Sequence, residues 1–150
     1  MNTSTLFNNF ALTFLLLPLA IMSFGQQGFQ KETAEKVLIK SFNLQGNEIV
    51  SLNLGEPIEV KTWDKSTVRI QMSVSLENGT ESILKSLVQA GKYNLKYSVE
   101  DEIYTIYGTD LRKQIEVGGT PLLENVSILV YAPENVLVLL PEGTEQKDSL

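Results

Sequence analysis

The clearest pattern in this chain is a strict alternation of apolar and polar residues over residues 67–76. Every second position is apolar, and these positions are Val68, Ile70, Met72, Val74 and Leu76. Because the side chains of a β-strand point alternately to its two faces, the pattern predicts a strand that buries one face and exposes the other. The run before it, residues 58–63, is expected to pair with this strand as a hairpin through a tight connection at residues 64–66.

Shorter alternating runs predict the other strands of a fold with about eight strands. They lie at residues 37–44, 50–54, 93–99, 103–107, 111–117, 126–131 and 136–140. One segment has a different period: after Thr80, apolar residues recur every three or four positions, which predicts one short amphipathic helix over about residues 80–90. The fold class is therefore mostly β, and three arrangements fit it: an antiparallel meander, a sandwich, or a short β-solenoid-like head.

The first 25 residues are not expected to belong to this fold. Residues 10–22 form an almost unbroken apolar run, and Ser23 and Gly25 follow it, which is typical of a signal peptide cleaved after Gly25. An uncleaved anchor is the alternative, but a run of about 13 residues is shorter than the roughly 20 that span a bilayer. We expect no stable membrane span after cleavage, and a protein exported to the periplasm, the cell surface or the medium.

The rest of the chain is expected to form a single unit. Residues 26–36 are polar and are predicted to be a flexible lead-in, and residues 37–140 a single β-rich domain. Residues 141–150 are predicted to be a disordered tail. The chain has no cysteine, so its stability cannot come from disulfides. A domain of this length can bury enough apolar surface to be stable without them.

Composition excludes several kinds of function. The chain has no His and no Cys, so neither a Ser-His nor a Cys-His nucleophile can form, and zinc and copper would lack their usual ligands. Its net charge is −6 and it has no basic cluster, which argues against nucleic-acid binding. No catalytic residue, metal site or cofactor is predicted, because the chain has no phosphate-binding glycine loop and no other catalytic motif.

A pair of carboxylates is the one catalytic arrangement that this composition permits, as in glycoside hydrolysis. The candidates for such a pair are Glu59, Asp64, Asp110 and Glu116. The ordinary alternative is that Glu59 and Glu116 occupy solvent-facing strand positions and that Asp64 lies in a turn. A carboxylate-dependent glycan hydrolase, or an accessory subunit of one, is kept as an alternative function.

Aromatic residues supply the candidates for binding: Trp63, Tyr104 and Tyr107, together with Asp64 beside the tryptophan. Trp63 is the only tryptophan. It is either an exposed platform on which a sugar or a protein partner stacks, or a ring that covers the end of a strand. Two adjoining predicted strands carry four tyrosines, Tyr93, Tyr97, Tyr104 and Tyr107. These tyrosines form either an exposed aromatic patch or half-buried cross-strand pairs.

Several short motifs resemble exported bacterial proteins of the DUF4097-like adhesin family. They include Phe-Asn-Leu at 42–44, Leu-Asn-Leu at 52–54, Ile-Glu-Val-Lys at 58–61, Trp-Asp-Lys at 63–65 and Ile-Leu-Val-Tyr-Ala-Pro-Glu-Asn at 128–135. The resemblance implies an envelope or surface β protein that acts in adhesion, with no catalytic residues to carry over. Members often continue into a right-handed β-solenoid after the Pro-x-Asn turn. Because few residues follow Asn135, we expect a compact head that lacks most of the solenoid.

The leading hypothesis is a non-enzymatic, exported β domain of the bacterial envelope that interacts with a protein or a glycan. Exposed strand edges and the aromatic surface would make the contacts. The glycan hydrolase is one alternative, and a periplasmic partner of an envelope-sensing system is another.

Overall fold

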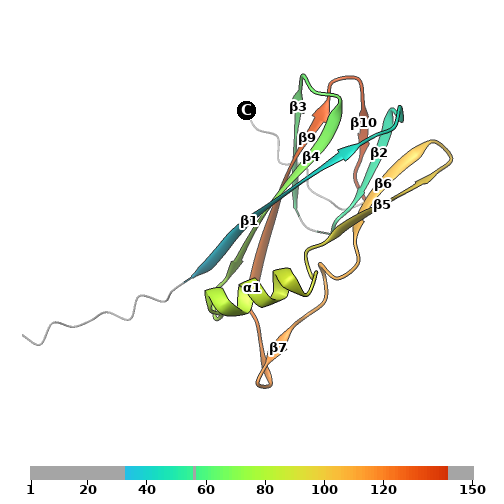
Figure 1. The fold of residues 1–150 in the computed structure, drawn as a ribbon. Coiled ribbons are helices and arrows are strands. Elements are labelled where there is room, and N and C mark those ends of the chain that lie inside the picture. The colour runs from blue at the N-terminus through green and yellow to red at the C-terminus, as the bar shows by residue number, and fades with distance from the viewer. Residues whose placement is uncertain (1–32, 56, 142–150) are drawn as a thin grey trace, which may run out of the picture.

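Two four-stranded sheets, a small hairpin and one helix make up residues 33–55 and 57–141, which the computed structural model describes (Figure 1). Sheet A has the strand order β1 (Ala34–Asn43), β4 (Thr67–Leu76), β9 (Glu124–Pro133) and β3 (Ile58–Trp63). Sheet B has the order β10 (Leu137–Leu139), β2 (Ile49–Asn53), β6 (Ile103–Gly108) and β5 (Leu95–Glu100). At one end lie the helix α1 (Glu81–Gln89) and the hairpin of β7 (Glu116–Val117) and β8 (Thr120–Pro121).

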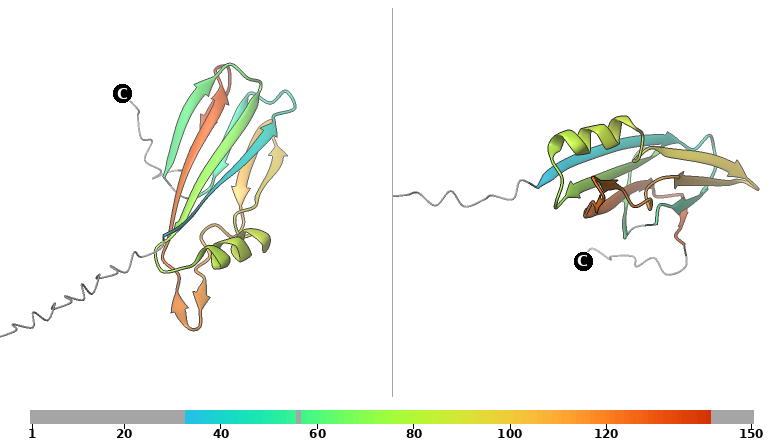
Figure 2. Two further views of the ribbon diagram at one scale, coloured as in Figure 1. Left: turned by 60° about the vertical axis from the view of Figure 1, so that its left-hand side comes forward. Right: turned by 90° about the horizontal axis from the view of Figure 1, so that it is seen from below.

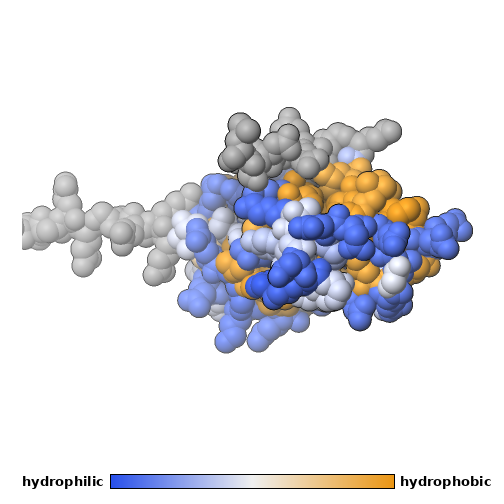
Figure 3. All heavy atoms as spheres, turned by 90° about the horizontal axis from the view of Figure 1, so that it is seen from above, coloured by the Kyte–Doolittle hydropathy of each residue, from blue (hydrophilic) through white to orange (hydrophobic). Residues whose placement is uncertain are grey.

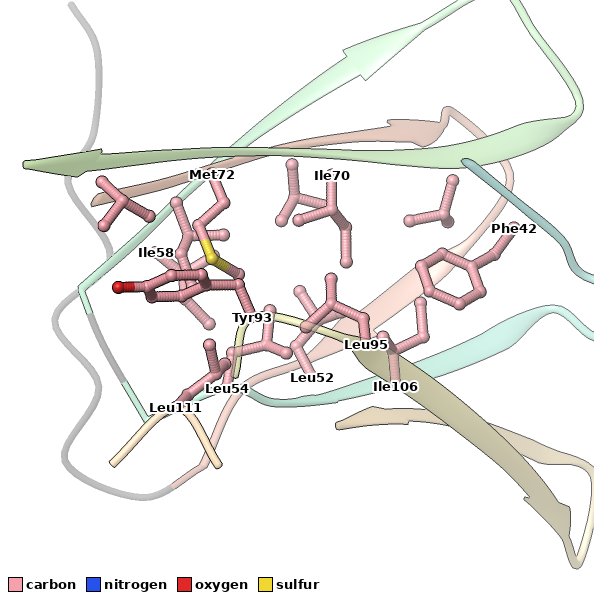
Figure 4. Packing of buried hydrophobic residues seen from close by; sticks show 14 of the residues in the cluster. Phe42, Leu52, Leu54, Ile58, Ile70, Met72, Tyr93, Leu95, Ile106 and Leu111 are labelled. Atoms are coloured by element: carbon pink, nitrogen blue, oxygen red, sulfur yellow. The ribbon is translucent and has the colours of Figure 1, made fainter. Parts of the chain in front are cut away.

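The two sheets pack their apolar faces together and form one hydrophobic core (Figure 4). In β4 every second side chain is buried, in the phase that the alternation predicts. Buried residues of sheet B face them, among them Leu52, Tyr104 and Ile106. The predicted fold class, mostly β with one short helix, is confirmed, and the sandwich is the arrangement that forms.

The expected hairpin of β3 and β4 does not form, because β9 lies between these two strands (Figure 2, left). β9 is antiparallel to β4 and parallel to β3, and its Val130 lies opposite Ile70 on one side and Val60 on the other. Nearness in sequence favours a hairpin of β3 and β4. However, β9 is an apolar strand whose Val130 is fully buried, and its position between β4 and β3 gives its backbone hydrogen-bond partners on both sides. The connection at residues 64–66 therefore passes over the end of β9.

Strand pairing in the sandwich is mixed, unlike that of an antiparallel meander. Three of the seven ladders are parallel, namely β10–β2, β2–β6 and β3–β9. Parallel neighbours arise because the chain passes repeatedly from one sheet to the other, as it does between β2 and β3 and between β9 and β10.

The helix α1 has the predicted cap. Thr80 is extended, and its Oγ1 accepts a hydrogen bond from the backbone N–H of Ile83 at 3.3 Å. The helix ends before Gly91, whose φ of +80° lies in the left-handed region that residues with side chains disfavour. Leu84 is buried in the core, so the helix covers one end of the sandwich beside β1 (Figure 2, right).

The strand predicted at residues 111–117 is much shorter in the structure, where only Glu116–Val117 is extended and paired, as β7. Leu111 turns into the core instead of continuing a strand. Two carbonyls of this stretch, those of Leu111 and Lys113, accept hydrogen bonds from the side chain of Lys92, which holds the stretch in a loop. A tertiary contact has therefore overridden the alternating pattern.

The beginning of the described chain also differs from expectation. β1 starts at Ala34, inside the expected lead-in of residues 26–36, because Ala34 is buried against the core. The predicted signal peptide, residues 1–25, lies outside the described residues, as do most of the lead-in and almost all of the tail. Within residues 33–55 and 57–141, no helix has the length and apolar character needed to cross a membrane.

Candidate functional site: an aromatic groove between two sheet edges

The hairpin of β5 and β6 extends beyond the edge of sheet A (Figure 1). Tyr97 and Val99 on β5 point to the same side as the buried Leu95, yet 47% and 43% of their surfaces are exposed. Sheet A does not reach over this part of the hairpin, so side chains that face the core side meet solvent there. An opening therefore lies between β1, at the edge of sheet A, and β5, at the edge of sheet B.

Three aromatic rings form the inner wall of this opening. The rings of Tyr97 and Tyr104 stack almost parallel, with centroids 4.7 Å apart and an interplanar angle of 9°. Phe42 meets both edge-on, with its centroid 6.3 Å from that of Tyr97 and 6.4 Å from that of Tyr104. Stacked and edge-to-face pairs are favourable, so the cluster holds the Tyr97 ring in place. Phe42 and Tyr104 are buried, whereas Tyr97 presents its surface to solvent.

The opening is a groove with a volume of about 520 Å³, within the usual range of small-ligand sites. Tyr107 completes its aromatic lining. The polar lining comes from Lys40, Ser41, Asn43, Gln45 and Lys96. A second hollow of about 180 Å³ shares Lys40 and Leu95 with the first. The two hollows adjoin at Lys40 and Leu95, and together they are called here the aromatic groove.

Lys40 crosses between the two sheets where the hollows meet. Its Nζ donates a hydrogen bond to the carbonyl of Leu95 at 2.6 Å and lies 5.3 Å from the centre of the Phe42 ring. Lys40 occupies an inward-facing position of β1, opposite Ile70 of β4. An ammonium group has three hydrogens, and the contact with Leu95 uses one of them.

The structure brings two of the four predicted binding residues, Tyr104 and Tyr107, to the aromatic groove. Tyr104 offers no free ring face, because only 1% of its surface is exposed and it supports Tyr97 from behind. Burial, and to a smaller extent the neighbouring Tyr97, raises the pKa of the Tyr104 hydroxyl. Tyr107 is partly exposed and lies opposite Lys96 of β5.

The other two predicted residues, Trp63 and Asp64, lie elsewhere, at the end of β3 and in the connection to β4. They line a separate hollow of about 380 Å³. The Trp63 ring is 5.4 Å from the ring of Tyr131, and its Nε1 donates a hydrogen bond to the carbonyl of Thr67 at 2.8 Å. Lys65 Nζ lies 5.3 Å from the ring centre. These contacts tie the connection across the end of β9, which gives Trp63 a structural role.

A buried ionic cluster lies in the segment between α1 and β5. Lys92, only 5% exposed, donates hydrogen bonds to the carbonyls of Asp110, Leu111 and Lys113. Its Nζ also pairs with Glu124 at 3.2 Å, and the other carboxylate oxygen accepts a hydrogen bond from the Tyr93 hydroxyl at 2.6 Å. Burial, followed by the contact with Glu124, raises the pKa of Tyr93 well above its usual range. The cluster fixes the loop after β6 onto β9.

The carboxylate candidates do not meet in the aromatic groove, since none of the ten residues that line its main hollow is acidic. Glu59 forms an ion pair with Lys61 at 3.0 Å along β3. Asp110 follows β6, and Glu116 lies on β7, at the other end of the molecule from Asp64 (Figure 1). Within the described ranges there is also no group of three or more acidic side chains that could hold a metal ion.

An apolar row crosses the outer face of sheet B, away from the groove. Leu137, Ile49 and Ile103 lie opposite one another on β10, β2 and β6, and Leu137 is 58% exposed. Figure 3 shows a hydrophobic area on the surface of the molecule when it is seen from above. The row has no polar side chain that could orient a ligand, so the aromatic groove is the better candidate site.

Sequence reasoning missed Lys40 and Phe42 as site residues, and it considered Tyr97 only as one of four clustered tyrosines. The alternation placed Phe42 on the buried face of its strand but could not show which rings it would touch. Lys40 was the available signal. A lysine at an inward-facing position between Leu38 and Phe42 indicates an edge strand beside an opening.

No protein-family model and no curated protein sequence matches this chain. Among solved structures, it is similar to a putative cell adhesion protein from Clostridium sporogenes ATCC 15579, with a TM-score of 0.39 and 13% identity over 71% of this chain and 45% of that one. A putative lipid binding protein from Parabacteroides distasonis ATCC 8503 has a TM-score of 0.30 and 15% identity, over 69% of this chain and 37% of that one. The chain thus spans less than half the length of either protein. The DUF4097-like resemblance stays a prediction from the motifs.

Proposed function

We propose that this protein is a non-enzymatic glycan-binding module of the bacterial cell envelope and that the aromatic groove is its binding site. The observation that carries the proposal is the Tyr97 ring. It is about half exposed, and Tyr104 and Phe42 hold it in one orientation from behind. A rigid ring that needs no reordering loses little conformational entropy when a ligand binds.

The chemistry of the groove matches that of a sugar chain. A sugar ring presents a face of C–H groups that packs on an aromatic ring, and its hydroxyls need hydrogen-bond partners around that contact. The groove supplies such partners in the amides of Asn43 and Gln45 and the ammonium group of Lys40, and Lys96 borders it at the rim.

Binding without catalysis is proposed because of what lines the groove. Glycoside hydrolysis needs two carboxyl groups on either side of the scissile bond. The main hollow has none among its lining residues, and neither does the second hollow. A sugar bound on Tyr97 would meet amides and lysines, which orient it and have no means of cleaving it.

The proposal is tested by titration calorimetry of a panel of oligosaccharides against the wild type, Tyr97→Ala and Trp63→Ala. We expect Tyr97→Ala to weaken binding at least about tenfold, which corresponds to about 1.4 kcal/mol of lost stacking. Trp63→Ala should bind as the wild type does, since its ring lies outside the groove. Failure of the folded wild type to bind any glycan would refute the proposal, as would an equal loss in both variants. Release of new reducing ends would refute the absence of catalysis.

A protein partner is the second candidate, and the free edge of β1 favours it. This ten-residue strand is the outermost strand of sheet A, and Val37 and Ile39 on its outward face are each 54% exposed. An extended segment of another protein could add to such an edge by backbone hydrogen bonds. Val37→Lys would then weaken co-purification of that partner from an envelope extract, whereas Tyr97→Ala would not.

A further inference from the structure

We infer that the aromatic groove selects acidic glycans, that is, sugar chains that carry anionic oxygens on carboxylate or sulfate groups. The inference rests on the proposed glycan-binding function and names the class of ligand. Its basis is a reversal of charge: the whole chain has a net charge of −6, yet the charged residues that line the main hollow are two lysines, Lys40 and Lys96. In the second hollow the only charged lining residue is Lys40.

The two lysines come from opposite walls of the groove. Lys40 projects from β1, at the edge of sheet A, and Lys96 lies on β5, at the edge of sheet B, next to Tyr97 in the chain. Lys40 occupies an inward-facing position, whereas the alternation of β5 directs Lys96 away from the face of Tyr97, so Lys96 borders the hollow at its rim. A sugar ring stacked on Tyr97 would therefore have the ammonium group of Lys40 beside it, and an anionic group that extends past the edge of β5 could meet Lys96. Anionic groups on consecutive sugar units of a chain could reach both of them, whereas a neutral chain would gain only hydrogen bonds.

Lys40 is already held in place for such a contact. Its Nζ is fixed by the carbonyl of Leu95 at 2.6 Å and by the face of the Phe42 ring, and it keeps two hydrogens for a ligand. A lysine side chain normally loses considerable rotamer entropy when it binds a ligand. The side chain of Lys40 is already ordered in the free protein, so binding would cost less entropy. The neighbouring aromatic surface also lowers the local screening by water, which strengthens attraction between charges.

Two matched pairs of probes isolate the charge of the ligand. Hexagalacturonate is compared with its methyl ester, which has the same sugar rings without the charge, and dextran sulfate is compared with plain dextran. We expect the full chain to bind the acidic member of at least one pair about tenfold more tightly than the neutral member at low salt. The preference should shrink severalfold when the ionic strength rises from about 0.02 M to about 0.3 M, because salt screens exposed charges.

Charge-removing variants locate the effect. Lys40→Gln should lower the affinity for the acidic probe about tenfold, and Lys96→Gln should lower it severalfold. The affinity for the neutral counterpart should fall by a smaller factor, because glutamine keeps a hydrogen-bond donor and removes only the charge. Lys40 also ties the two sheets together, so the exposed Lys96 provides the decisive variant if Lys40→Gln is less stable. Lys65→Gln is the matched control, because Lys65 lies on Trp63 outside the groove and its loss should change neither affinity.

The outcomes separate the two proposals. Equal or tighter binding of the neutral members overturns the acidic preference and leaves the glycan-binding function standing. Acidic binding that Lys96→Gln does not weaken, or that Lys65→Gln weakens as much, also overturns the inference, because the charge would be recognised elsewhere. If the wild type binds neither these probes nor any sugar of the wider panel, both proposals fall together.

Discussion

Trp63, at the end of β3, and Tyr97, within β5, are both large aromatic residues, and they differ in the contacts that surround their rings. Trp63 donates its N–H to the carbonyl of Thr67, packs on Tyr131 and has Lys65 over its ring. Tyr97 has its ring contacts on one side, with Tyr104 and Phe42, and its hydroxyl is 3.5 Å from Gln45 Nε2, the outer limit of a hydrogen bond. A ring whose polar atom and faces have internal partners stabilises the fold, whereas a ring supported from one side can receive a ligand.

Topology explains this difference. At Trp63, β9 separates β3 from β4, so the connection must span about two strand spacings, roughly 10 Å, and the indole bridges that span. The β5–β6 hairpin, which carries Tyr97, extends past sheet A (Figure 1), and 47% of the Tyr97 surface is exposed. The tryptophan thus compensates for a missing strand pair, and the tyrosine occupies a place that the opposing sheet leaves open.

The largest effect is expected for Phe42→Ala, which removes the buried ring behind Tyr97. Phe42 is nearly fully buried, so we expect a loss of about 3–5 kcal/mol in the free energy of unfolding, measured by chemical denaturation. Phe42→Leu, which keeps most of the apolar volume, should cost less than about 1.5 kcal/mol. A loss below about 1 kcal/mol for Phe42→Ala would show that the rings of the groove are not held by the core.

The second prediction compares the stability effects of Trp63→Ala and Tyr97→Ala. Trp63→Ala removes an indole hydrogen bond and ring packing and should cost about 2–3 kcal/mol, less than for a fully buried tryptophan. Tyr97→Ala removes one stacked pair on an exposed hairpin and should cost about 0.5–1.5 kcal/mol. Denaturation curves of the two variants measure both values. A larger loss of stability for Tyr97→Ala than for Trp63→Ala would mean that Tyr97 is the structural ring and would contradict its assignment as the binding ring.

Local patterns in the sequence were sufficient for the strands and their faces. The alternation in residues 67–76 and the inward position of Phe42 are both confirmed, because each depends only on the two-residue period of a strand. The cap at Thr80 is likewise a local interaction. These features follow from neighbours in the chain, which the sequence displays directly.

Features that depend on distant segments could not be predicted in the same way. The place of β9 between β3 and β4 is set by contacts between residues about 60 positions apart, and the sequence-adjacent hairpin was the simpler expectation. The groove depends on how far one hairpin extends past the opposite sheet, which no periodicity encodes. Trp63 stood out because tryptophan is rare, yet Tyr97, one of five tyrosines, has the more accessible ring.

The last prediction concerns pH and adds a third ring to the comparison, Tyr93, which is buried and whose hydroxyl is hydrogen-bonded. Burial and Glu124 raise the pKa of Tyr93 above the ordinary value of 10.0, so the folded protein favours the neutral phenol. The stabilisation from this group is complete below pH 10.0 and is lost as the pH rises through that value, because only the unfolded chain then releases the proton readily. The slope can reach about 1.4 kcal/mol per pH unit.

Tyr93→Phe isolates the contribution of this hydroxyl. The variant should lose about 1–2 kcal/mol at neutral pH with the hydrogen bond to Glu124, but its stability should fall less steeply than that of the wild type above pH 10. Urea denaturation at a series of pH values measures both slopes, and tyrosinate absorbance follows the ionisation directly. Parallel slopes would mean that the Tyr93 hydroxyl ionises as easily in the folded protein as in the unfolded chain, and that its ring is held by packing alone.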